Sequence, residues 1–205
     1  MPRAGPMRDR DRVFQVRIHG RGGQGVVTAA ELLSVAAFLE GREAQAFPTF
    51  GSERTGAPVV AFCRIDDKVI RVREPIAEPD AVIVQDPTLL HQVDLFGGLQ
   101  DDGYVLLNTA RTFEELGLGE YTERFEAGRC VTVPATDIAR ECLGRPLPNA
   151  ALLGAFAALT REVSLKSVAA AIYARFPGRT GGRNASAAEQ AYALVAGATQ
   201  EVSRA

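Results

Sequence analysis

The segment that decides the fold is Phe14-Gln-Val-Arg-Ile-His-Gly-Arg-Gly-Gly-Gln-Gly-Val-Val-Thr-Ala-Ala-Glu-Leu-Leu33. Its apolar alternation predicts a strand over residues 13–18, and its apolar stripe predicts a helix over residues 26–40. Between them, Gly20, Gly22 and Gly25 fit the spacing G-x-G-x-x-G. Glycines let backbone amides approach a ligand at the positive end of a helix. We therefore expect the amides of residues 21–26 to form a phosphate-binding turn, in a shape that suits a diphosphate.

Glycines at such a turn also have a purely structural use, because they let the helix pack closely on the sheet. Two neighbouring features bear on the choice. Arg21 places a guanidinium inside the turn and favours an anion. An NAD site would need an acid at the end of the second strand, but Glu40 and Glu43 precede the expected strand. The pattern therefore favours a phosphate-bearing cofactor other than a nicotinamide nucleotide.

The composition is that of one globular α/β domain. The 205 residues can bury a core without metals or crosslinks. We expect a flexible N-terminus at 1–12 and a single domain at 13–205. A net charge of −2 gives no support for nucleic acid as a partner. No apolar run or leader suggests a membrane or secretion, which predicts a cytoplasmic protein.

The cysteines and histidines argue against a metal centre in this chain. Cys63, Cys130 and Cys142 are far apart, and only two histidines accompany them. We expect these thiols to behave as small hydrophobic groups, with no zinc or iron–sulfur site built by this chain alone.

Short apolar runs between helical patterns predict a three-layer α/β/α fold with a mostly parallel mixed sheet and a Rossmann-like start. Buried parallel strands are expected at 81–84, 104–107 and 130–133, and a hairpin is expected from 59–65 and 69–72. The C-terminal third is predicted to be helical, at 136–143, 149–160, 164–176 and 186–196, with a glycine-rich turn at 176–184.

Capping residues help to place these helices. Asn149 and Ser164 are candidate N-caps, and Ser186 with Glu189 matches a capping box. The helix 149–160 is apolar nearly all round, which predicts burial on more than one side and suggests a subunit interface.

Two further groups of polar residues are candidates for ligand contact. The loop 45–58 gathers Ser52, Glu53, Arg54 and Thr55, which could contact a ligand or a neighbouring subunit or simply connect two elements. Other polar residues follow the expected parallel strands, at the sheet edge where open α/β sheets bind ligands: Gln85, Asp86, Asn108, Thr109 and Thr136. Strand-end capping explains the second group equally well. No constellation for covalent or acid–base catalysis is present, so no catalytic residue is predicted and the chain looks like a binding subunit.

Seven segments in register resemble the gamma subunit of pyruvate:ferredoxin oxidoreductase and related 2-oxoacid:acceptor oxidoreductases. The resemblance covers about residues 14–196. The segments are His19–Leu33, Ala44–Pro58, Asp86–Leu90, Asp102–Gly103, Gly144–Asn149, Leu153–Phe156 and Arg175–Gly178. Members acting on pyruvate, 2-oxoisovalerate, 2-oxoglutarate and aryl-pyruvates use similar gamma chains, so the resemblance does not select the 2-oxoacid.

The resemblance implies a complex that oxidatively decarboxylates a 2-oxoacid, most simply pyruvate, to an acyl-coenzyme A and passes electrons to ferredoxin. Thiamine diphosphate with Mg²⁺ and iron–sulfur clusters are then expected on partner alpha, beta and ferredoxin-like delta subunits. The chain itself has Asp101-Asp-Gly103 but lacks the paired asparagines that follow G-D-G in thiamine enzymes.

Within that family the gamma domain is associated with the coenzyme A side of the active site. Together with the glycine turn, this leads us to expect cofactor contacts by Gly20, Arg21, Gly22, Gly23, Gln24, Gly25, Ser52, Glu53, Arg54, Thr55 and Asn149. Two alternatives stay open: a structural clamp that only holds the catalytic chains together, and an independent NAD(P)- or flavin-binding oxidoreductase.

Overall fold

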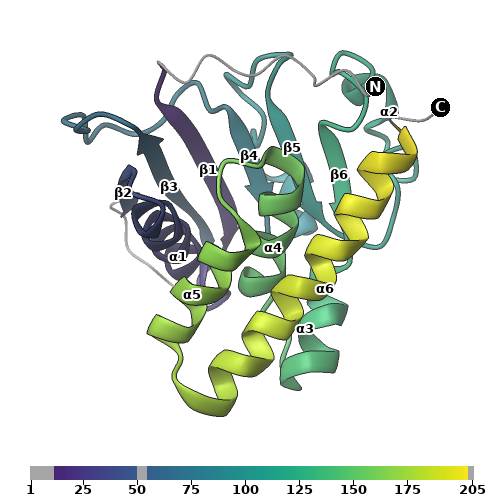
Figure 1. The fold of residues 1–205 in the computed structure, drawn as a ribbon. Coiled ribbons are helices and arrows are strands. Elements are labelled where there is room, and N and C mark those ends of the chain that lie inside the picture. The colour runs from purple at the N-terminus through teal and green to yellow at the C-terminus, as the bar shows by residue number, and fades with distance from the viewer. Residues whose placement is uncertain (1–11, 50–54, 203–205) are drawn as a thin grey trace, which may run out of the picture.

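The computed structural model describes residues 12–49 and 55–202, which form a six-stranded sheet in the order β2-β3-β1-β4-β5-β6 (Figure 1). Strands β1, β4, β5 and β6 pair in parallel, whereas β3 runs antiparallel to both β1 and β2. The predicted α/β fold with a mostly parallel mixed sheet is therefore confirmed. The strands are β1 (Phe14–Arg21), β2 (Glu43–Pro48), β3 (Pro58–Asp66), β4 (Ala81–Val84), β5 (Tyr104–Asn108) and β6 (Cys130–Val133).

The main helices all cover one face of the sheet, as Figure 1 shows with α1, α3, α4, α5 and α6 in front of the strands. Their bounds are α1 (Val26–Leu39), α3 (Ala135–Leu143), α4 (Asn149–Thr160), α5 (Leu165–Arg175) and α6 (Gly178–Val202). They share one large apolar cluster with the strands, which includes Phe14, Ile18, Leu33 and Phe156. Because the last four follow β6 in sequence, the expected helical C-terminal part is confirmed.

The opposite face of the sheet is covered by a thinner layer. It contains the short helices η1 (Pro87–His91) and α2 (Gly119–Thr122) and the connections around them. Val82 and Val105 from the strands and Phe125 from a connection belong to a second, smaller apolar cluster on this side. A buried arginine also lies here, because the Arg17 guanidinium donates hydrogen bonds to the carbonyls of Leu95 and Gly97, both at 2.8 Å.

The predicted hairpin of 59–65 with 69–72 is wrong in its second strand. β3 forms as expected, but residues 69–72 are not a strand. β3 already pairs with β1 on one side and β2 on the other, so it has no free edge for a hairpin partner. The segment is instead held by Arg64, which donates hydrogen bonds to the carbonyls of Val72 and Glu74. Both Val69 and Val72 remain exposed.

The last helix begins much earlier than predicted. The expected turn at 176–184 and the capping box at Ser186 are both wrong, because α6 already begins at Gly178. Each glycine in a helix costs roughly 1 kcal/mol relative to alanine. Burial of an apolar face outweighs that cost here, since Ala185, Ala187, Ala188 and Ala191 are all buried. The predicted cap at Ser164 is confirmed, because its side chain accepts a hydrogen bond from the Ser167 amide at the start of α5.

Helix α4 is the centre of the helical layer. All twelve of its residues are buried, as its all-round apolar character predicted. The burial comes from packing within this chain, against α6 above all, so it needs no subunit interface to explain it. The contact is close at Gly154, where an added Cβ would lie 2.0 Å from the backbone oxygen of Ala188.

Over residues 12–49 and 55–202, none of the helices has the combination of length and apolar character that crossing a bilayer requires.

The Gly154 contact generates a stability prediction. Gly154→Ala should lower the free energy of unfolding by about 1–3 kcal/mol, because the new methyl group overpacks against α6 backbone that cannot easily move. Gly197→Ala, in α6 but with open space around its Cβ position, is the matched control and should raise stability by about 0.4–1 kcal/mol. Chemical denaturation of both variants measures the two effects. Equal effects would contradict close α4–α6 packing at Gly154.

Candidate functional site

The glycine turn lies between β1 and α1 at the carboxyl edge of the parallel strands. β1 continues through Gly20 and Arg21, so it is longer than predicted and the turn itself is Gly22–Gly25. Gly23 and Gly25 have φ angles of +93° and +75°, which non-glycine residues rarely adopt. Gly25 ends the turn as the N-cap residue of α1.

Two of these glycines also permit close packing. A Cβ on Gly20 would lie 2.6 Å from Cγ2 of Val26, and a Cβ on Gly25 would lie 2.9 Å from Nδ2 of Asn149. The packing interpretation of the motif therefore holds at these positions. Because Gly25 has no side chain, the starts of α1 and α4 lie side by side, with the buried Asn149 between them.

The side chain of Gln24 closes the turn. Its Oε1 accepts a hydrogen bond from the Arg21 amide at 2.8 Å, and its Nε2 donates to Oδ2 of Asp86 at 2.7 Å. Asp86 lies just after β4, so this contact ties the turn to the next parallel strand. We call Arg21, Gln24, Asp86 and Thr88 the loop lock.

The guanidinium of Arg21 is engaged by its own chain. Its Nε lies 3.2 Å from Oδ2 of Asp86. The two terminal nitrogens of the guanidinium donate hydrogen bonds to Oγ1 of Thr88 at 2.7 Å, to the carbonyl of Gly56 at 3.0 Å and to Oε1 of Gln92 at 3.0 Å. The geometry thus gives Arg21 a role in shaping the turn. Its expected direct contact with an anion would require these bonds to be exchanged.

The loop lock stabilises the ionised form of Asp86. Burial opposes ionisation, but hydrogen bonds from Thr88 and Gln24 and the charge of Arg21 outweigh it and lower the pKa of this carboxyl. Asp86 is therefore an anion at neutral pH and cancels the charge of Arg21.

Three helices begin around the turn. The start of α1 has no side-chain cap, whereas the Thr136 amide in α3 donates to Oδ1 of Asn108 and the Ala150 amide in α4 donates to Oδ1 of Asn149. The N-cap residues themselves supply no side-chain hydrogen bond, and they are Gly25, Pro134 and Pro148. The first amides of a helix have no partner within it and carry a partial positive charge. The predicted cap at Asn149 is wrong, because this residue is already inside α4 and its Oδ1 accepts from the adjacent Ala150 amide.

A cavity of about 240 Å³ opens at the same edge, and we call it the strand-end pocket. Asn108 shapes its wall: its Nδ2 donates to the Gln85 carbonyl and to Oγ1 of Thr136, both at 2.7 Å, and its Oδ1 accepts from the Thr136 amide at 3.0 Å. The pocket is lined by Gln24, Gln85, Asp86, Pro87, Asn108, Thr109, Ala110, Pro134, Thr136, Asp137 and Arg140. All five polar residues predicted at the strand ends line it.

Not every predicted site residue can be placed. Thr55 lies near the turn, with its methyl group 4.0 Å from the Cβ position of Gly23. Ser52, Glu53 and Arg54 fall outside the described residues. Asp86 and Thr88 belong to the lock but were not among the predicted cofactor contacts; the position of Asp86 after a buried strand was the available signal.

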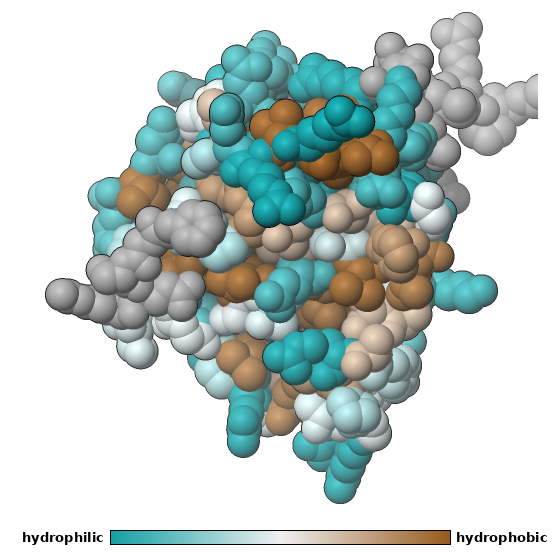
Figure 2. Space-filling model, turned by 90° about the vertical axis from the view of Figure 1, so that its left-hand side faces the viewer, coloured by the Kyte–Doolittle hydropathy of each residue, from teal (hydrophilic) through white to brown (hydrophobic). Residues whose placement is uncertain are grey.

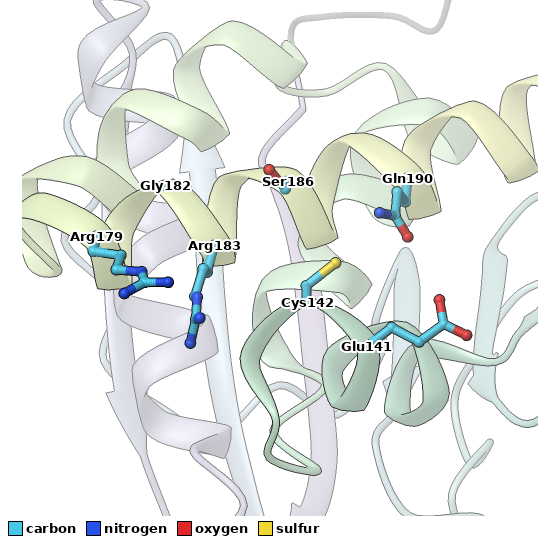
Figure 3. Close-up of a pocket in the computed structure, with 7 residues that line it drawn as sticks. All are labelled: Glu141, Cys142, Arg179, Gly182, Arg183, Ser186 and Gln190. Carbon is cyan, nitrogen blue, oxygen red and sulfur yellow. The ribbon is translucent and has the colours of Figure 1, made fainter.

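Larger hollows occur elsewhere, away from the glycine turn. One of about 470 Å³ lies between α3 and α6, where Arg179 and Arg183 extend from one side of α6 (Figure 3). Another, of about 450 Å³, is lined by residues of α1, β2 and α5 on the face shown in Figure 2, where apolar residues gather. Neither includes a residue of the glycine turn.

The described part of the chain offers no cluster of three or more potential metal ligands, and the pKa values of its three thiols, Cys142 included, are raised. Burial raises the pKa of Cys63 and Cys130 to about 12, so both thiols stay protonated at neutral pH. A protonated, buried thiol behaves as a small hydrophobic group.

The loop lock makes stability depend on pH. The pKa of Asp86 is lower in the folded chain than in the unfolded chain. The contribution of ionised Asp86 to the free energy of unfolding is therefore complete above the usual aspartate pKa of about 3.9, and it is lost as pH falls through the lowered pKa. Asp86→Asn should therefore be less stable than the parent at pH 7, and the difference should shrink below about pH 4. Thermal melts between about pH 3 and pH 7 measure it, and a constant difference across that range would contradict the ionised lock.

The similarity of this chain to known proteins shows its family. Residues 15–194 match the family described as pyruvate ferredoxin/flavodoxin oxidoreductase. The chain is 52% identical over 180 residues to the pyruvate/ketoisovalerate oxidoreductases common subunit gamma of Thermococcus kodakarensis, covering 88% of this chain and 96% of that one. It is also similar to the crystal structure of pyruvate oxidoreductase subunit PORC from Thermotoga maritima, with 36% identity, a TM-score of 0.74 and coverage of 88% and 96%.

A more distant structure shares the fold. The 2-oxoglutarate:ferredoxin oxidoreductase of Magnetococcus marinus, solved with 2-oxoglutarate, coenzyme A and succinyl-CoA bound, matches with a TM-score of 0.71 at 18% identity, over 91% of this chain and 31% of that one. The chain belongs to the pyruvate ferredoxin/flavodoxin oxidoreductase family, as the gamma subunit of a multi-subunit oxidoreductase complex.

Proposed function

We propose that this subunit receives coenzyme A at the carboxyl edge of its sheet, for a complex that oxidatively decarboxylates a 2-oxoacid, with pyruvate as the first candidate. The observation that carries the proposal is the meeting of three helix starts around one glycine turn, with no side-chain cap on the first amides of α1. Such amides are suited to the diphosphate of coenzyme A, because they point at the anion and add the positive ends of the helix dipoles.

The proposed division of labour leaves the redox chemistry to partner subunits. Thiamine diphosphate with Mg²⁺ and the iron–sulfur clusters would lie on alpha, beta and ferredoxin-like delta chains, with ferredoxin as electron acceptor and the cytoplasm as location. In this chain, Asp101 and Asp102 come shortly before β5, at the opposite edge from the glycine turn, and Asp101 pairs with Arg124. This chain's own residues would bind and orient coenzyme A so that its thiol reaches the neighbouring subunit's acyl group.

In detail, we propose that the amides at the start of α1 and the Asn149 side chain contact the diphosphate directly. Thr55 lies beside the turn and would complete the site together with Ser52, Glu53 and Arg54. The glycines at positions 20, 22, 23 and 25 leave room for the approach. Arg21 and Gln24 would act mainly by holding the turn open through the loop lock.

A nicotinamide or flavin nucleotide fits the geometry less well. In a dinucleotide fold the strand after the first helix pairs with the first strand and ends in an acid that binds ribose. Here β3 lies between β1 and β2, so β2 lies two strand spacings, about 10 Å, from β1 instead of one. Glu43 also stands at the beginning of β2, away from the turn.

The structural-clamp alternative is favoured by one observation, the engagement of the Arg21 guanidinium by its own chain. It predicts that coenzyme A touches only the partner subunits. The exposed Val35, Phe38 and Leu39 on α1 offer apolar surface for assembly under either proposal.

Asn149 provides the sharpest test. Asn149→Ala should weaken coenzyme A binding to the assembled complex about tenfold, because one hydrogen bond to a charged group is lost. Asn184→Ala is the matched control, since Asn184 is also buried but lies in α6 and donates to the Thr180 carbonyl. Titration calorimetry gives the affinities, and size-exclusion chromatography checks assembly. Unchanged affinity of the Asn149 variant in an intact complex would favour the clamp.

A further inference from the structure

We propose that the strand-end pocket binds the adenine ring of coenzyme A, with the carboxamide of Gln85 as the group that recognises it. This inference rests on the proposed function, because it divides one ligand between two neighbouring subsites. The diphosphate would occupy the start of α1, and the base would enter the pocket lined by Gln24, Gln85 and Thr136.

The size of the pocket suits one part of a cofactor. Whole-ligand sites usually measure about 300–1,000 Å³, whereas a water molecule needs only about 30 Å³. At about 240 Å³ the strand-end pocket is too small for all of coenzyme A and too large for one water. A single heterocyclic base is a ligand of the right scale.

Its charge argues against a second phosphate. The lining includes the carboxylates of Asp86 and Asp137 and one guanidinium, that of Arg140, which pairs with Asp137 at 2.8 Å. The Arg21 charge that balances Asp86 is already bound to it. A neutral, polar group therefore fits the lining better than an anion does.

Gln85 is the feature that the fold itself leaves unexplained. The residue is only 2% exposed, and neither its Nε2 nor its Oε1 has a hydrogen-bond partner. Burying a polar group without a partner costs about 1–3 kcal/mol. The other two amides of the lining, Gln24 and Asn108, have partners for both their nitrogen and their oxygen. In the proposal, Gln85 turns from the pocket floor toward the base when the base enters.

The carboxamide of Gln85 carries one donor beside one acceptor, and this pattern selects adenine over the rest of coenzyme A. Adenine presents its N6 amino group and its N7 acceptor on one edge, and a glutamine carboxamide pairs with both. The secondary amides of the pantetheine arm are trans, so their N–H and C=O point in opposite directions and cannot both reach one carboxamide. The apolar lining residues Pro87, Ala110 and Pro134 offer surface for the faces of a flat ring.

The experiment compares coenzyme A with its analogue in which hypoxanthine replaces adenine. The analogue has a carbonyl at position 6, so this edge carries two acceptors and repels Oε1 of Gln85. Calorimetry on the assembled complex should show about tenfold weaker binding of the analogue. Gln85→Met keeps the length of the side chain but removes both polar atoms, so it should bind the two ligands equally. The Gln190→Met control, in the groove between α3 and α6, should keep the discrimination.

The outcomes separate this inference from the proposed function. Equal binding of both ligands by the parent complex, or discrimination that survives Gln85→Met, overturns the adenine subsite. If Gln85→Met only raises the melting temperature of the subunit, the unpartnered amide is a structural cost and the inference also fails. Gln85→Leu serves as a second variant if Met does not fold. The response of Asn149→Ala to coenzyme A decides the proposed function independently of these results.

Discussion

The close approach of α1 and α4 at Gly25 is the constraint on which the rest of the site depends. Gly25 has a left-handed backbone angle and no side chain, and Asn149 occupies the space that a Cβ would fill. Any larger residue there would separate the two helix starts. Because α4 is buried along its whole length, its position is in turn fixed by the sheet and by α6.

This constraint gathers the backbone amides of several helix starts at one edge of the sheet. The starts of α1, α3 and α4 bring helix-start amides together, while Gln24 and Arg21 use their hydrogen bonds to hold the turn to the residues after β4. The structure thus separates two tasks within the glycine motif. The glycines leave room for a ligand and for close packing, and the polar side chains keep the turn in shape.

Local sequence patterns predicted the strands and most helices because hydrophobic periodicity and capping are local properties. The segment Phe14–Leu33 predicted the first strand, turn and helix, and Ser164 marked the start of α5 correctly. The errors came from contacts between distant segments. Residues 69–72 are no strand because β2 takes the edge of β3, and α6 includes a glycine-rich start because alanines far along it pack against α4.

In the candidate site, too, local patterns were predictable from the sequence and contacts between distant segments were not. The glycine spacing and the polar residues after β4 and β5 could be read from the sequence, and they do lie together. The pairing of Arg21 with Asp86 and the missing partners of Gln85 could not, because both depend on where a distant strand or helix places an atom. Ser52, Glu53 and Arg54 remain predictions.

Hydrogen exchange of the assembled complex, measured with and without coenzyme A, shows whether this subunit receives the cofactor at its helix starts. We expect the cofactor to slow exchange of the amides at 22–28, 135–137 and 149–152, where the three helices begin, and to leave the α3–α6 groove unchanged. Protection confined to the partner subunits, with no change at these three helix starts, would contradict this proposal.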